Sequence, residues 1–98
     1  MERTQTLARP SLPTGPSLSS QLLTAAADHL AEHHPTDPLT GPGWSRALCA
    51  ATITTLCALP APVANAAAAR AVLALPDSEL GITRGEYAIR LRAAARTL

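Results

Sequence analysis

Histidine and cysteine side chains are the residues of this chain best suited to bind a metal. His29 and His33 lie four positions apart, a spacing that places both imidazoles on one face of a helix and occurs in zinc sites. Cys49 and Cys57 are about 12 Å apart along a helix axis, so one tetrahedral site could not hold both. A third ligand would be one of these cysteines or Asp37. We expect instead that the histidines lie near a helix C-terminus, where a partly charged imidazole is favoured, and that no metal is bound.

The same residue types do not assemble into a catalytic set. Ser45, Cys49, His29 and Asp28 include a nucleophile, a base and a carboxylate, but nothing in their spacing brings them together. Cys49 and Cys57 are expected to be buried free thiols, too far apart on one helix for a disulfide and suited to a reducing cytoplasm. The sequence contains no glycine-rich phosphate loop. We therefore predict a cytoplasmic, non-enzymatic protein without a cofactor.

The composition predicts helices that pack closely through small side chains. The 98 residues suffice for one domain, and they include no Phe, one Trp and one Tyr. Hydrophobic residues make up 47% of the chain, and most of them are Ala and Leu. Ala favours helix formation but buries little area. The stability margin of so small a core is thin, so a partner chain or self-association is expected to add to it. The net charge of +1 is too near zero to indicate nucleic-acid binding by itself.

Prolines and glycines divide the chain into an N-terminal arm and a single helical domain over 17–98. Residues 1–16 hold three prolines among Ser and Thr and are predicted to form a flexible, disordered arm. Pro35 ends the first helix, a loop over 35–43 follows, and further prolines end the next two helices. The predicted fold class is all-α, a small bundle of about four short helices, with helices near 17–34, 45–59, 62–75 and 84–97.

The first and last of these helices carry clear apolar stripes. In the first helix, five apolar residues at helical spacing form one face, and these are Leu22, Leu23, Ala26, Ala27 and Leu30. In the last helix, Thr83 and Glu86 have the spacing of a capping box, and Glu86 and Arg90 form a favourable i,i+4 pair. The stripe of the last helix consists of Tyr87, Leu91, Ala94, Ala95 and Leu98.

The second helix differs because it is apolar or small nearly all the way round, with Arg46 as its single charge. Such a helix is normally buried on every side, which is difficult in so short a chain. We therefore predict that it forms an interface with another protein chain, in a homodimer or small homo-oligomer. The expected interface residues are Trp44, Leu48, Ile53 and Leu56, with Trp44 as the main energetic contributor. The alternative is that the same four residues form the core of the monomer.

The C-terminal segment 80–98 carries a further motif, formed by Leu80, Gly81, Ile82, Thr83, Gly85, Arg90, Leu91 and Ala94. These residues resemble the end of the helix-turn-helix in sigma-factor region 4 and related regulators. In that family the glycine makes the turn and the following helix enters the major groove. The resemblance implies DNA binding, and the residues that would contact phosphates are Arg84, Arg90, Arg92 and Arg96. The alternative is a capping box that starts a helix whose arginines face solvent.

The uncharged stretch over 47–69 supports a third interpretation. It has the length of a membrane span, and 46–66 mimics a signal peptide, with Arg46 before an apolar run and Ala64-Asn65-Ala66 as a cleavage site. Its prolines, its many Ala and Thr residues and its distance from the N-terminus argue against insertion. The function we predict first is therefore a non-enzymatic, regulatory interaction module that self-associates. DNA binding comes second, and membrane association or secretion third.

Overall fold

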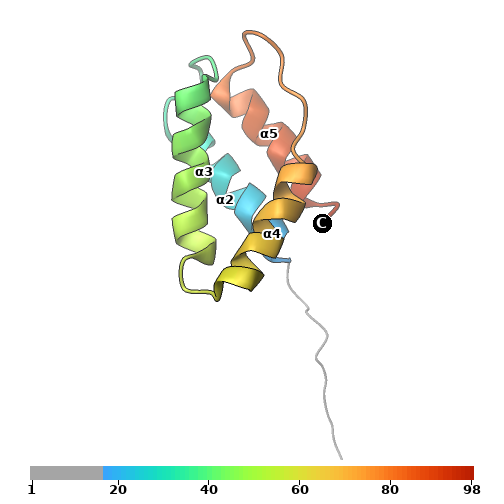
Figure 1. Ribbon diagram of the computed structural model, residues 1–98. Helices are drawn as coiled ribbons and strands as arrows, with labels where there is room; N and C mark the ends of the chain where they lie inside the picture. The colour runs from blue at the N-terminus through green and yellow to red at the C-terminus, as the bar shows by residue number, and fades with distance from the viewer. Residues whose placement is uncertain (1–16) are drawn as a thin grey trace, which may run out of the picture.

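Helix α2 (Leu18–Glu32) is the element against which the other described helices pack. The computed structural model describes residues 17–98, which form α2, α3 (Gly41–Leu56), α4 (Ala61–Leu73) and α5 (Arg84–Ala95). Each of the last three packs on α2, and Figure 1 shows α2 behind them, between α3 on one side and α4 and α5 on the other. The predicted all-α bundle is confirmed, whereas the predicted arm at 1–16 lies outside the described residues.

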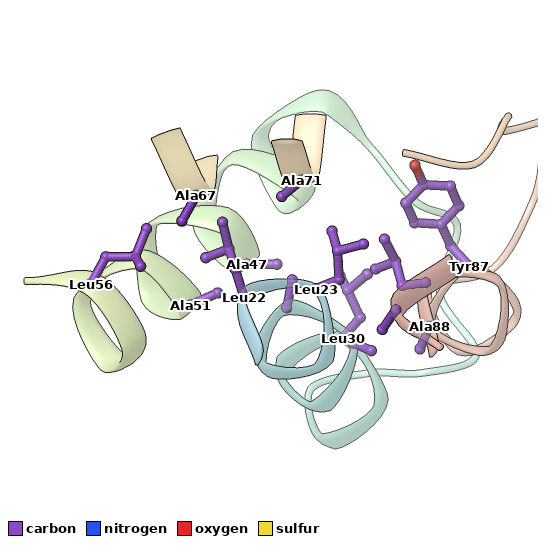
Figure 2. Close-up of a cluster of buried hydrophobic side chains, with 14 of the residues drawn as sticks. Leu22, Leu23, Leu30, Ala47, Ala51, Leu56, Ala67, Ala71, Tyr87 and Ala88 are labelled. Atoms are coloured by element: carbon purple, nitrogen blue, oxygen red, sulfur yellow. The ribbon is translucent and has the colours of Figure 1, made fainter. Parts of the chain in front are cut away.

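The apolar face of α2 explains its central position. The predicted face is confirmed, with no side chain more than 1% exposed among Leu22, Leu23, Ala26, Ala27 and Leu30. In the view of Figure 2, the leucines of this face lie between Leu56 of α3 and Tyr87 of α5, so one helix links both ends of the core. The helix begins where Ser17 Oγ accepts a hydrogen bond from the Ser20 N–H at 3.1 Å, a common N-cap arrangement.

Small residues and two serines hold the neighbouring helices close to α2. α4 contributes Ala67 and Ala71 to the core, and α5 contributes Ala95. Ser19 Oγ donates a hydrogen bond to Ala67 O at 2.8 Å, and Ser20 Oγ donates to Ala95 O at 2.9 Å. Both serines are buried, and a buried hydroxyl without a partner is unfavourable. These two bonds therefore help to set the positions of α4 and α5 along α2.

Helix α3 begins at Gly41, four residues before the predicted start at Ser45. Thr40 Oγ1 accepts a hydrogen bond from the Gly43 N–H at 3.0 Å, and Pro42 lies in the first turn, where its missing N–H costs no helical bond. Gly41, Pro42 and Gly43 were predicted to belong to the loop over 35–43, but they form the first turn of α3. The other three helices begin within one residue of their predicted starts and end two residues earlier than predicted.

Within this single chain, the helix that was expected to be buried on every side is covered along one side only. α3 buries one narrow face, formed by Gly43, Ala47, Ala51 and Leu56, because α2 is the helix that packs against it. Elsewhere on α3, Thr52 and Thr54 satisfy their hydroxyls by donating to the backbone oxygens four positions earlier, at 2.8 and 2.9 Å. Cys49 and Cys57 are free and exposed. The expectation that both thiols are buried is therefore wrong for this chain by itself.

Backbone hydrogen bonds connect the start of α5 to the loop that precedes α3. The Leu39 N–H donates to Ile82 O at 2.8 Å, and the Gly85 N–H donates to Pro35 O at 2.8 Å. Gly81 precedes these contacts with a φ of 86°, a conformation that glycine adopts without steric cost. Two loops distant in the sequence therefore form one continuous end of the bundle.

The predicted capping box at the start of α5 is confirmed. Thr83 Oγ1 accepts from the Glu86 N–H, and the Glu86 carboxylate accepts from the Thr83 N–H at 3.0 Å. The Thr83 backbone hydrogen bond lowers the pKa of Glu86, and the Thr83 hydroxyl adds to this effect. Arg90, which was expected to pair with Glu86, instead forms an ion pair with Glu79 at 2.8 Å.

Leu23→Ala is expected to lower the free energy of unfolding by about 2–5 kcal/mol, because it leaves a cavity at the centre of the core. Leu73→Ala is the matched control, since Leu73 is 88% exposed at the end of α4, and its effect should stay within about 0.5 kcal/mol. Urea denaturation followed by circular dichroism measures both values. Equal losses in the two variants would show that the α2 face does not form the core.

Candidate functional site

The outer side of α3 presents an uncharged stripe at the spacing of one helix face. Its residues line a shallow groove of about 360 Å³, and we call them the α3 stripe: Ser45, Leu48, Cys49, Thr52 and Ile53. Ile53 is 65% exposed, and Leu48 is partly buried. The Thr52 hydroxyl donates to Leu48 O, so this polar group is already satisfied. The groove is mostly apolar and no charged side chain lines it, which makes it a candidate surface for contact with another protein.

The structure brings together two of the four residues predicted to form an interface. Leu48 and Ile53 belong to the α3 stripe, whereas Leu56 is only 2% exposed and lies in the core. The partly buried Trp44 meets the ring of Tyr87 edge to face, with centroids 5.5 Å apart and an interplanar angle of 86°. Trp44 therefore contacts α5 and does not belong to the stripe.

Three residues of the α3 stripe were not predicted, namely Ser45, Cys49 and Thr52. Counted from Ser45, the stripe occupies positions i, i+3, i+4, i+7 and i+8, which is the spacing of one helix face. The signal is weak because the buried face of the same helix is built from residues just as small, including Ala47 and Ala51. Residue size and polarity alone therefore do not separate the inner side of α3 from its outer side.

Two of the arginines predicted to contact DNA form ion pairs within the chain. Arg90 Nη2 lies 2.8 Å from Glu79 Oε1, and Arg92 Nη2 lies 2.8 Å from Asp28 Oδ1. All four of these side chains are substantially exposed, so each pair adds little stability. Arg96 is exposed at the end of α5. The positive charge of this helix is therefore partly neutralised by neighbouring carboxylates.

The segment that resembles a helix-turn-helix has a different geometry here. Residues 74–83 separate α4 from α5, whereas a helix-turn-helix joins its helices by a turn of about three or four residues. The connection is held to α5 by Tyr87 Oη, which donates to Pro76 O at 2.9 Å, and by Arg90 Nη1, which donates to Asp77 O at 3.0 Å. DNA binding stays a prediction, and this geometry does not favour it.

The histidines at the end of α2 lie together, without a third ligand-type side chain of residues 17–98 to complete a metal site. The rings of His29 and His33 are stacked with centroids 4.3 Å apart, and His33 Nδ1 lies 2.9 Å from His29 O. Within residues 17–98, no group of three His, Cys, Asp or Glu side chains could hold a metal ion. Partial burial lowers the pKa of His29, and the nearby His33 and Arg84 lower it further. Arg84 also donates from Nε to the backbone O of His33 at 2.7 Å.

The uncharged stretch that suggested a membrane segment is divided between two helices. It runs through most of α3 and α4, with a turn between them, and the signal-like segment 46–66 crosses the same turn. None of the helices in the described part of the chain is long and apolar enough to cross a membrane.

Comparisons with known proteins add no assignment. No protein-family model matches the chain, and neither the curated proteins nor the solved structures give a significant match.

Tyr87→Phe is expected to lower the free energy of unfolding by about 1 kcal/mol at neutral pH, because Pro76 O loses a hydrogen-bond donor. Burial raises the pKa of the Tyr87 hydroxyl above its ordinary value, and Asp77 adds to this effect. The folded-state pKa is then above the unfolded one, so this contribution is complete below about pH 10 and is lost as the pH rises through the folded pKa. The phenylalanine variant lacks this titration.

Denaturation curves recorded by the fluorescence of Trp44, the single Trp of the chain, measure the difference at neutral and alkaline pH. The stability advantage of the wild type over Tyr87→Phe should shrink at alkaline pH. A difference that stays constant would show that the hydroxyl has the same pKa in the folded and unfolded states.

Proposed function

We propose that this chain is a cytoplasmic, non-enzymatic interaction module that self-associates through the α3 stripe. The observation that carries the proposal is the uncharged groove on which Ile53 is 65% exposed. A branched aliphatic side chain in such a groove gains free energy when a second surface removes it from water. The two thiols Cys49 and Cys57 are free, which fits a reducing compartment.

A second copy of the chain suits the stripe because its pattern can be self-complementary. The small Ser45 and Cys49 alternate with the larger Leu48 and Ile53, so large residues of one helix can pack against small residues of the other. A two-fold axis that passes through the centre of the stripe, perpendicular to the helix, generates an antiparallel helix pair. Arg46, the single charged residue of α3, is not part of the stripe, and with the axis at Cys49 its two copies would be about 9 Å apart along the pair.

The size of the stripe favours a reversible dimer. Stable protein interfaces use about 20–30 residues on each side, whereas this stripe has five, and residues at its rim add the remaining contacts. Affinity in such small interfaces depends on a few central apolar side chains, and here Leu48 and Ile53 fill that role. We expect a monomer in dilute solution and a dimer as the concentration rises.

Ile53→Asp is expected to weaken self-association by about tenfold or more. The introduced carboxylate would have to lose water inside the paired groove without gaining a partner. Sedimentation equilibrium over a concentration series measures the dissociation constant. Because Ile53 is exposed in the monomer, the helical circular dichroism signal should not change.

Ile89→Asp is the matched control for this experiment. Ile89 is the same residue type with nearly the same exposure, 67%, but it lies on α5. This variant should dimerise as the wild type does. Equal weakening by both substitutions would contradict a specific role of the α3 stripe, and a wild type that stays monomeric at every concentration would exclude self-association.

Mild oxidation provides an independent test of the antiparallel arrangement. Cys49 lies at the centre of the stripe, so a two-fold axis there brings the Cys49 side chains of the two copies together. Treatment with diamide should join them in a disulfide, with the two electrons and two protons passing to the diamide. The two Cys57 residues would be about 24 Å apart along the same pair, so they should not be joined.

Non-reducing electrophoresis of the cysteine variants separates these cases. Cys49→Ser should abolish the covalent dimer, and Cys57→Ser should retain it. Both thiols are exposed in the monomer, so neither has an advantage in access to the oxidant. A covalent dimer that depends on Cys57 would contradict the proposed register.

A further inference from the structure

A second cavity, separate from the α3 stripe, opens between the end of α2, the loop before α3 and the start of α5. Its volume is about 550 Å³, within the range of small-ligand pockets. The charged and titratable side chains that line it are Asp37, Arg46, Arg84, His29, His33 and His34. Two guanidinium groups and three imidazoles thus share the cavity with a single carboxylate. The positive charges of the two guanidinium groups are only partly balanced by this carboxylate, so a negative charge bound among them is favourable.

Arg84 is the best-fixed of these cations. Its Nε donates to His33 O at 2.7 Å, which fixes the guanidinium at the wall of the cavity, and its two Nη groups carry four further N–H donors. Gly43 provides the space for this group, because a Cβ at that position would lie 2.7 Å from Arg84 Nη1 and 3.0 Å from Thr40 Oγ1. The glycine and the loop carbonyl therefore place the guanidinium against the first turn of α3.

We propose that this cavity binds a tetrahedral oxyanion, the phosphate group of a small ligand. Guanidinium groups match the oxygens of phosphate with pairs of hydrogen bonds, and Arg46 and Arg84 supply two of them from different elements. The neighbouring imidazoles provide further N–H donors. A metal is the less suitable occupant, because within residues 17–98 no three of the ligand-type side chains are close enough to hold one.

The electrostatic surroundings of His29 agree with this assignment. Partial burial, His33 and Arg84 disfavour its protonated form and lower its pKa, while Glu32 acts in the opposite sense. Arg46 and Asp37 line the same cavity. An anion bound among these groups would favour the protonated imidazole. By linkage, protonation of His29 and anion binding strengthen each other.

Inorganic sulfate is the probe of choice, because its charge is constant across the neutral range whereas that of phosphate changes. We expect sulfate, added at constant ionic strength against chloride, to produce saturable NMR shifts at the amides of Gly43 and Arg84. The pKa of His29, followed by its ring protons, should rise in sulfate relative to chloride. Inorganic phosphate should shift the same amides.

Arg46→Gln and Arg96→Gln form a matched pair, since both arginines are exposed but only Arg46 lines the cavity. Arg46→Gln should weaken sulfate binding by roughly three- to tenfold, and Arg96→Gln should leave it unchanged. His34→Gly removes an imidazole while keeping the backbone, because His34 has a φ of 58° that glycine adopts readily. This variant should also weaken binding.

Several results would overturn the proposal. Shifts that grow linearly without saturation, or that chloride reproduces, would show only general ionic screening. Equal weakening by Arg46→Gln and Arg96→Gln would show that net charge matters and the cavity does not. Binding of a short DNA duplex at these amides, without any sulfate binding, would assign the arginines to a nucleic-acid surface instead.

Discussion

The burial of the apolar face of α2 is the interaction on which the rest of the structure depends, because α3, α4 and α5 each pack mainly against this helix. Its leucines are three of the five largest fully buried side chains, while the neighbouring helices contribute mostly alanine. Alanine allows close approach but buries little area, so each outer helix is held along one narrow face. The remaining sides of those helices face solvent, and both proposed binding surfaces arise from this arrangement.

Helix α3 shows the consequence most clearly, since three of its sides have different surroundings. Its inner side packs on α2 through Ala47 and Ala51, and its outer side carries the α3 stripe. Its N-terminal part, at Gly43 and Arg46, borders the cavity that we propose binds an oxyanion. Threonine hydroxyls bonded within the helix leave the uncharged outer surface with few unsatisfied polar groups. The stripe and the cavity share no lining residue, so the two proposals can be tested with separate variants.

Local sequence patterns predicted the features that a single helix determines by itself. The spacing of Leu22, Leu23 and Leu30 gave the buried face of α2, and Thr83 with Glu86 gave the capping box of α5. The inner side of α3 could not be predicted, because Gly, Ala, Ser and Thr are compatible with both core and surface. For the same reason, only Leu48 and Ile53 of the four expected interface residues lie together on the outer face of α3. The cavity at the end of α2 was not predicted either, because packing gathers its residues from distant segments.

The hydrogen bond from Ser20 to Ala95 joins positions 75 residues apart. Because the ribosome synthesises a chain from its N-terminus, α2 exists well before α5 can pack on it. While translation proceeds, α3 and α4 emerge before α5 and can cover their sides of α2, but the α5 side stays open until α5 itself has been synthesised. Nascent chains at this stage expose leucines that the finished protein hides, a condition in which aggregation competes with folding. Chaperone dependence in the cell is therefore expected to fall more heavily on nascent chains that still lack α5 than on chains in which α5 has packed on α2.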